Sequence, residues 1–347
     1  MNVVETRGLA KAYRGRRVVD RFDMRVAQGD IYGFVGKNGA GKSTVMKMIC
    51  GLVAPTAGEI ELFGARVGGD ERAASGEGAA AGSGGESGRG WDAPGAPRIG
   101  ALIEAPGLLP NLNAFQNLMA KALAMGIVDA AERSREMLAL VGLSEAGKKK
   151  VKGFSLGMKQ RLGLALALVG SPDLLLLDEP LNGLDPEGTR AVRNLLVRLN
   201  QSFGITIVIS SHVLDQLDRV ATRFGVIADG TLVREMTAEE MQSECGDSLR
   251  VRTTDPARTL ALLDEAFPQA VLRAQPDGSL SISGRCELEA VSRLLRDTDQ
   301  TVLELGVVRC DIEDYFLELM EGTSASRSPI RGAAAPAPRA QGGGPRV

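Results

Sequence analysis

The stretch GKNGAGKST, which begins at Gly36 and ends at Thr44, constrains the fold of this chain more than any other feature. It matches the pattern G-x-x-x-x-G-K-[ST], and it stands between the apolar run IYGFV and a segment that favours a helix over residues 42–51. Glycines in such a loop let consecutive backbone N–H groups curl around phosphates, and the helix N-terminus adds favourable partial charge. The pattern therefore predicts a strand, a phosphate-binding loop and a helix, in that order. A chance glycine-rich turn is the alternative, and the flanking elements argue against it.

The side chains of this loop have distinct expected roles. Lys42 reaches the β- and γ-phosphates, the Ser43 hydroxyl ligates Mg²⁺, and Thr44 adds a hydrogen bond to the α-phosphate. The remaining nucleotide-binding positions of the loop are expected to be Gly36, Asn38, Gly39, Ala40 and Gly41.

Two acidic residues follow the apolar run DLLLL, which begins at Asp173. Four consecutive leucines predict a strand buried on both faces, and ligands of parallel sheets gather at the carboxyl ends of the strands. We expect Asp178 to hold Mg²⁺ through its water shell and Glu179 to polarise the attacking water as general base. Two solvated acids after a strand are the alternative.

The single histidine of the chain, His212, ends a second apolar strand, ITIVISSH. A lone histidine is more often an ordinary hydrogen-bonded group than a catalytic one. Its place at the carboxyl end of a predicted parallel strand nevertheless favours a role at the γ-phosphate, where it holds the attacking water.

Composition narrows the classes of protein and partner. A chain of 347 residues suggests about two domains. The formal net charge of −2 predicts no nucleic-acid partner. The longest apolar runs are far shorter than the roughly 20 residues that span a bilayer, so any membrane part is expected to come from another chain.

The chain divides into segments of different character. Strands alternate with helices over residues 1–235, which predicts an α/β domain with a mostly parallel sheet. Within it, residues 65–97 are rich in Gly, Ala and Ser and are predicted to be a disordered insertion. Residues 236–322 predict a small α+β accessory domain of ferredoxin-like type. Residues 323–347 are predicted to be a disordered tail.

Together, the phosphate loop, the acidic strand end and His212 resemble the ATP-binding-cassette ATPases. FSLGMKQR, residues 154–161, is similar to the signature motif of that family, with Ser155 and Gly157 at matching positions. The resemblance implies that two cassettes stack head to tail, so that the signature motif of one completes the phosphate site of the other. Ser155 Oγ, the Gly157 N–H and the N-terminus of a helix over 158–169 would then cap the γ-phosphate. Leu156 and Met158 depart from the family pattern.

Two further positions fit the resemblance. Tyr13 matches the aromatic residue that stacks on adenine, with a plain strand tyrosine as the alternative. Asp185, in the loop LNGLDP, matches the residue that couples the two ATP sites. The resemblance also implies the fold: a P-loop cassette with a mostly parallel sheet, an antiparallel edge subdomain and a helical subdomain.

Glu104 stands where the family has a glutamine that meets Mg²⁺ and the attacking water. In this respect the chain is similar to the ATP-binding subunits of lantibiotic-immunity and bacitracin-resistance exporters. A carboxylate still accepts from water and ligates Mg²⁺, but it cannot donate as an amide does. Glu104 is therefore expected to be both a catalytic residue and a metal ligand, with simple sequence drift as the alternative.

The resemblance implies an ATPase with ATP and Mg²⁺ as cofactors, in the cytoplasm on the inner face of the membrane. Its expected partners are an integral membrane permease and a second ATP-binding subunit, expected to be a second copy of the chain, and the cargo is an antimicrobial peptide or hydrophobic drug. Two alternatives stay open: a non-transport clamp acting in translation or DNA repair, and a regulatory module that binds ATP but barely hydrolyses it.

Overall fold

The structure is a computed structural model, and it describes residues 1–67, 97–245, 248–284, 286–308 and 312–325. Nearly all of the predicted disordered insertion, and all but the first three residues of the predicted tail, lie outside the described residues.

The central element is a six-stranded sheet in the order β11-β10-β4-β9-β8-β7. All neighbours pair in parallel except β10 and β11, which form an antiparallel pair. Its strands, in chain order, are β4 (Ile31–Val35), β7 (Ile99–Leu102), β8 (Leu174–Asp178), β9 (Thr206–Ser211), β10 (Arg223–Ala228) and β11 (Thr231–Thr237).

The leucine run of β8 explains why this strand lies in the centre of the molecule. Leu174 and Leu176 pack into the core on one face of the sheet, whereas Leu175 and Leu177 pack into the core on the other. Since successive side chains of a strand point to opposite faces, a strand that is covered on both sides needs an apolar residue at every position. The sequence prediction of a doubly covered strand is confirmed.

A second, antiparallel sheet contains the N-terminus. It packs against the core on one face of the six-stranded sheet. Its order is β2-β1-β5-β6, with β3 pairing β1 in addition. The strands are β1 (Asn2–Tyr13), β2 (Arg16–Phe22), β3 (Arg25–Ala27), β5 (Ala57–Leu62) and β6 (Ala65–Val67).

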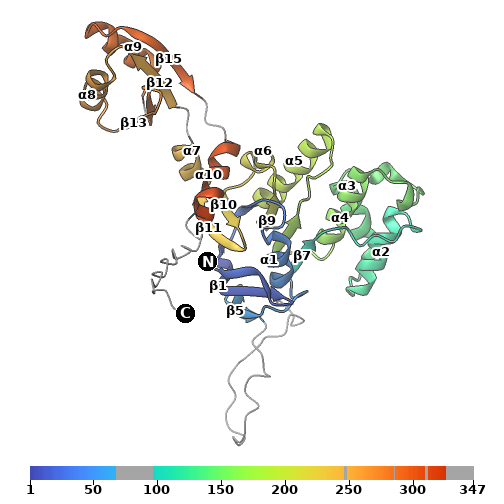
Figure 1. The fold of residues 1–347 in the computed structure, drawn as a ribbon. Helices are drawn as coiled ribbons and strands as arrows, with labels where there is room; N and C mark the ends of the chain where they lie inside the picture. The colour runs from blue at the N-terminus through green and yellow to red at the C-terminus, as the bar shows by residue number, and fades with distance from the viewer. Residues whose placement is uncertain (68–96, 246–247, 285, 309–311, 326–347) are drawn as a thin grey trace, which may run out of the picture.

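Helices cover both faces of the six-stranded sheet, and three of them form a separate lobe (Figure 1). That lobe, the helical subdomain, contains α2 (Ala114–Ala124), α3 (Ala130–Leu140) and α4 (Leu156–Leu168), with short 3-10 turns at Ser144–Ala146 and Val151–Gly153. The other helices of this part are α1 (Lys42–Ile49), α5 (Pro186–Phe203) and α6 (Leu214–Asp218).

The C-terminal part contains a four-stranded antiparallel sheet in the order β13-β14-β12-β15, with its own hydrophobic core. The succession strand–helix–strand–strand–helix–strand is that of a ferredoxin-like unit. Its elements are β12 (Ser248–Thr253), α8 (Pro256–Ala266), β13 (Val271–Ala274), β14 (Leu280–Ser283), α9 (Leu288–Asp297) and β15 (Val302–Val308). We call these elements the accessory unit.

Two helices flank the accessory unit and pack on the first part of the chain instead. They are α7 (Ala238–Glu244) and α10 (Ile312–Ala325), and Met241, Phe316 and Met320 belong to the large core beside the parallel sheet. The ring of Phe316 is fully buried, 5.8 Å from that of Phe224 on β10. The extent of the accessory domain, 236–322, remains a prediction, whereas the return of the chain to the cassette through α10 is a structural finding.

Among the helices that the structure describes, none combines the length and the apolar character of a membrane-spanning segment.

Candidate functional site

The predicted phosphate loop lies between β4 and α1, as the sequence pattern predicts. Gly41 has a φ of 113°, in the region that favours glycine, and a Cβ on Gly36 would lie 2.5 Å from Ile227 Cγ2. Both positions therefore require glycine. Lys42 is 6% exposed, and its Nζ donates to the carbonyl oxygen of Gly36 at 2.6 Å. The phosphate loop therefore wraps around the Lys42 ammonium group.

The other predicted loop residues surround this lysine. Asn38 and Gly39 are exposed, Ala40 is buried, and Ser43 and Thr44 are half-buried in the first turn of α1. The backbone N–H groups at the start of a helix are free to meet an anion, so this end of α1 suits a phosphate chain.

Asp178 and Glu179 are positioned by a serine of the neighbouring strand. Asp178 pairs with Ser210 in the parallel register of β8 and β9, and the Ser210 hydroxyl donates to Asp178 Oδ1 at 2.6 Å. The same hydroxyl accepts from the backbone N–H of Glu179 at 3.0 Å. Ser210 is fully buried. It was missed from the sequence, where its only signal is a hydroxyl that interrupts the apolar run ITIVIS.

Glu179 makes two different contacts with its two oxygens. Oε2 lies 2.8 Å from His212 Nδ1, and Oε1 lies 3.5 Å from Lys42 Nζ. Oε1 is buried and has no hydrogen-bond partner within the described residues. The structure therefore brings Lys42, Glu179 and His212 together, with one carboxylate oxygen left able to accept a proton.

Glu104 lies apart from that cluster. It follows β7, its side chain is 64% exposed, and it forms an ion pair with Lys47 of α1. Lys47 is one helical turn beyond Ser43 and was also missed from the sequence, since nothing there links two residues 57 positions apart. Glu104 and Glu179 both have positive φ, 61° and 50°, and such uncommon backbone conformations concentrate at functional sites.

The signature-like motif lies at the start of α4, in the helical subdomain. Ser155 is the N-cap of this helix, and its hydroxyl accepts from the backbone N–H of Met158 at 3.3 Å. The helix begins at Leu156, two residues earlier than predicted, because the serine caps it. Ser155 is exposed, and Gly157 is half-buried. This helix N-terminus is therefore accessible to a partner.

Leu156, one of the two departures from the family pattern, is 56% exposed and packs beside the loop that follows β8. A Cβ on Gly183 would lie 2.5 Å from Leu156 Cδ2. Asp185 ends that loop as the N-cap of α5, where its Oδ1 accepts from the Gly188 N–H at 3.0 Å. Its visible role in one chain is therefore to begin a helix, and its coupling role stays a prediction.

Tyr13 ends β1 with 44% of its side chain exposed. The Lys11 ammonium lies 5.2 Å from the centre of its ring. The ring is therefore accessible for stacking, as a role at adenine requires, and stacking remains a prediction.

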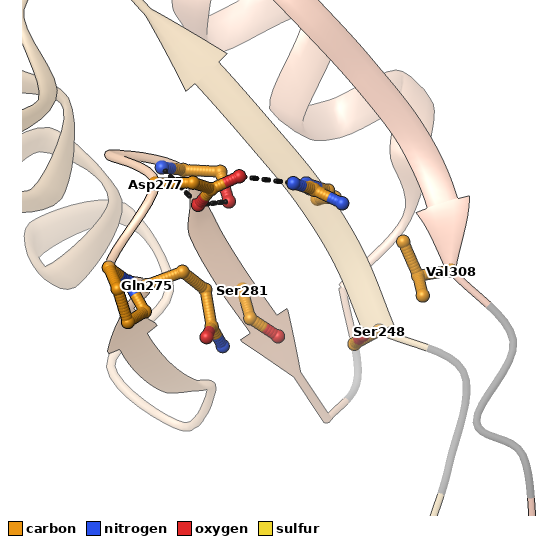
Figure 2. A pocket seen from close by; sticks show the side chains of 8 residues that line it. Ser248, Gln275, Asp277, Ser281 and Val308 are labelled. Atoms are coloured by element: carbon orange, nitrogen blue, oxygen red, sulfur yellow. Dashed lines mark hydrogen bonds and ion pairs between the residues drawn. The ribbon is translucent and has the colours of Figure 1, made fainter.

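A hollow lies elsewhere, on the open face of the accessory sheet (Figure 2). It holds about 340 Å³ and is lined by Ser248, Gln275, Ser281 and their neighbours. Within it Arg250 pairs with Asp277, and Ser279 with Arg250 lowers the pKa of that carboxyl to about 2. Its charges are matched internally, and none of the predicted ATP-binding residues lines it. The predicted ATP-binding residues therefore gather at the sheet edge and not at this hollow.

Comparisons with known proteins agree with this geometry. Residues 19–182 match the family described as ABC transporter. The chain is 34% identical over 321 residues to the bacitracin transport ATP-binding protein BcrA of Bacillus licheniformis, covering 92% of this chain and 98% of that protein. It is also 37% identical over 233 residues to the lantibiotic transport ATP-binding protein SrtF of Streptococcus pyogenes, covering 67% and 90%.

Solved structures show the same fold. The dimeric post-hydrolysis structure of the ATP-binding cassette MJ0796 with ADP and Pi covers 68% of this chain and 98% of its own, with a TM-score of 0.56 and 22% identity. A structure described as the ATP-binding subunit of an ABC transporter covers 70% and 93%, with a TM-score of 0.56 and 26% identity. The chain therefore belongs to the ABC transporter ATP-binding proteins, ATPases that are coupled to transport.

Proposed function

We propose that this chain is the ATP-hydrolysing subunit of an exporter of antimicrobial peptides or hydrophobic drugs, acting on a separate membrane permease. The observation that carries the chemistry is the meeting of Lys42, Glu179 and His212 at the carboxyl edge of the parallel sheet. The cargo class is supported by the relatives, which include proteins named for bacitracin and lantibiotic transport and for daunorubicin/doxorubicin resistance.

Hydrolysis needs a positioned water and stabilisation of the charge on the transferred phosphoryl group. Lys42 and the loop N–H groups supply the positive field. Glu179 accepts the proton of the water through Oε1, the oxygen without a hydrogen bond. His212 holds Oε2 at 2.8 Å and so fixes the direction in which Oε1 points.

Mg²⁺ fits the oxygen donors present. The Ser43 hydroxyl and the Asp178 carboxylate are hard ligands, and Asp178 is held from one side by Ser210, which leaves its second oxygen available. When bound with ATP, the ion neutralises charge on the β- and γ-phosphates. Glu104 joins this set only if its side chain leaves Lys47.

The second ATP-binding subunit is proposed to be a second copy of this chain. The exposed N-cap serine and the N-terminus of the 13-residue helix α4 present a group suited to a phosphate, far along the chain from Lys42. In a head-to-tail pair, Ser155 and Gly157 of one copy close the site of the other. The helical subdomain then transmits closure to the permease, on the inner face of the membrane.

A pull-down tests this proposal. Tagged protein with Glu179→Gln is recovered from detergent-solubilised native membranes in the presence of ATP, beside the Lys42→Ala variant as a control that does not form the ATP-bound state. We expect a polytopic membrane protein in stoichiometric amount with the first variant. Recovery of ribosomes, of DNA, or of no partner from a variant that still binds ATP would contradict the transport role.

A further inference from the structure

The outer strand of the accessory sheet, β15, has an edge that pairs with no other strand among the residues that the structure describes. It is the last strand in the order β13-β14-β12-β15 and forms the outer margin of the accessory unit (Figure 1). Its side chains are unusually apolar for an edge, with exposed fractions of 40% for Val302, 56% for Leu303, 51% for Val307 and 42% for Val308. A seven-residue edge strand of this kind presents unpaired N–H and C=O groups beside apolar side chains.

The opposite edge of the same sheet is different. Strand β13 has only four residues, and Arg273 on it is exposed, as is Val271. Short length and charge are ways in which proteins protect an edge from pairing. Strand β15 has neither device: it is nearly twice as long, it contains no proline, and Glu304 is its one charged residue.

That single charge is already compensated within the sheet. Glu304 lies 3.8 Å from Arg250 Nε and 3.9 Å from Arg252 Nε, both on the neighbouring strand β12. The edge therefore carries no unmatched charge that would repel another strand.

We propose that β15 pairs antiparallel with β15 of a second copy of this chain, around a two-fold axis at Leu305, so that two accessory units share one continuous eight-stranded sheet. The contact is isologous, since the same strand meets itself.

The register follows from the order of the residues. With the axis at Leu305, which packs toward the helices, each of the two Leu303 side chains lies opposite Val307 of the other copy. Glu304 lies opposite Gly306, which has no side chain to oppose it. Cross-strand apolar pairs stabilise a sheet, and like charges directly opposite destabilise it.

Other registers are worse. An axis at Glu304 places the two carboxylates directly opposite each other. An axis at Gly306 places Leu305 opposite Val307 and leaves Leu303 outside the regular pairing. The pairing with β12 is regular from Glu304 to Val308, and its one register shift falls between Glu304 and Val302, so the axis and the residues after it lie in the regular part of β15.

The occupant is a second copy because the strand is self-complementary about Leu305. A partner with another sequence would have no reason to match a pattern that is symmetric about its own centre. The contact lies far from the ATP site and needs no nucleotide, so it is separate from the head-to-tail pairing of the cassettes.

Sedimentation of the full-length chain without nucleotide tests the proposal. Leu303→Glu and Val307→Lys each bury a charge against an apolar residue twice per dimer, so each is expected to weaken dimerisation about tenfold or more. The double variant Leu303→Glu/Val307→Lys places opposite charges across the proposed register and is expected to recover dimerisation to within about threefold of the original. Val271→Lys, an equally exposed valine on the other edge strand, is the matched control and is expected to change nothing.

Three results would overturn the proposal. They are a chain that stays monomeric without nucleotide at its highest soluble concentration, a dimer that Leu303→Glu leaves intact, and a double variant no better than the single ones. Unchanged ATP binding and thermal unfolding of each variant show that the strand substitutions leave the fold intact. The rescue by two charges excludes simple misfolding, because a misfolded single variant would not be repaired by a second charge.

Discussion

The two halves of the proposed ATP site differ in how they are held. At the carboxyl edge of the parallel sheet, each catalytic group has a partner: Asp178 and Glu179 share Ser210, and Glu179 meets His212 and Lys42. At the start of α4, Ser155 is exposed, and within the described residues its hydroxyl bonds to the first turn of its own helix. One chain therefore supplies the whole of the first half. The second half has a group suited to a phosphate but needs the phosphate site of another copy.

One half of the site therefore holds groups that a single chain already positions, and the other half holds a group that completes the site of a second copy. Buried and hydrogen-bonded groups at the sheet edge need no rearrangement to face a phosphate, because strands β4, β8 and β9 fix them. The helix N-terminus of α4 needs only to be carried to a phosphate by another copy. We therefore expect the largest losses from groups that act on the nucleotide directly and smaller ones from groups that act only through another residue.

Glu179→Gln is the most severe test. The amide has no basic oxygen for the proton of the attacking water, so kcat is expected to fall about 10²–10⁴-fold while ATP binding persists. Steady-state phosphate release measures the first quantity, and size exclusion with ATP is expected to show a trapped dimer. Glu132→Gln, an exposed residue in the first turn of α3, is the control. A variant that binds ATP tightly yet stays monomeric with ATP would contradict the shared site.

Complementation examines the second half directly. Lys42→Ala removes the phosphate-binding ammonium, and Ser155→Arg blocks the start of α4, so each homodimer is expected to lose about a hundredfold in rate or more. A mixed dimer keeps one intact site, with Lys42 from one copy and Ser155 from the other. Hydrolysis well above that of either variant alone is therefore expected on mixing. Its absence, with mixed dimers shown by differential tagging, would mean that α4 does not act across copies.

Ser210→Ala tests how much the hydrogen bonds of the Ser210 hydroxyl contribute to the rate of hydrolysis. Without the hydroxyl, Asp178 loses a 2.6 Å hydrogen bond, and the backbone N–H of Glu179 loses its acceptor. A hydrogen bond of this kind contributes roughly 1–1.5 kcal/mol, so kcat is expected to fall about tenfold. Ser211→Ala is the matched control, because that buried hydroxyl bonds only the backbone of Val213. Equal losses in both variants would indicate a general effect on β9 rather than a role for Ser210.

The sequence predicts those parts that depend on local pattern. The phosphate loop and helix α1, the doubly buried leucine strand and the family itself all follow from motifs in which the chemistry and the spacing coincide. Residues whose role arises from pairing between distant strands are missed. Ser210 acts only because β9 lies beside β8 in parallel register, and no pattern along the chain gives that register.

Helix α10 shows the same limit at the level of domains. Its apolar residues suited the accessory domain as well as any other core, since periodicity identifies a buried face but not the surface that buries it. The structure shows that Phe316 packs against β10 of the cassette, close to α6, which follows His212. Glu321 of α10 also forms an ion pair with Lys37 of the phosphate loop, at 3.2 Å. Helix α10 therefore contacts the nucleotide-binding part in a way that composition does not reveal.

The ion pair between Lys47 and Glu104 is where the smallest effect is expected. Both groups are partly exposed, Glu104 by 64%, so solvent screens the attraction and the pair contributes about 0.2–1 kcal/mol. If the pair holds Glu104 away from the metal, Lys47→Ala lowers the Mg²⁺ concentration needed for half-maximal hydrolysis a few-fold, while Lys47→Ala has no effect once Glu104→Gln is present. A double-mutant cycle on that concentration measures the coupling. Additive effects would mean that Glu104 is free of Lys47 in the working enzyme, and that its carboxylate acts on the phosphate site without this restraint.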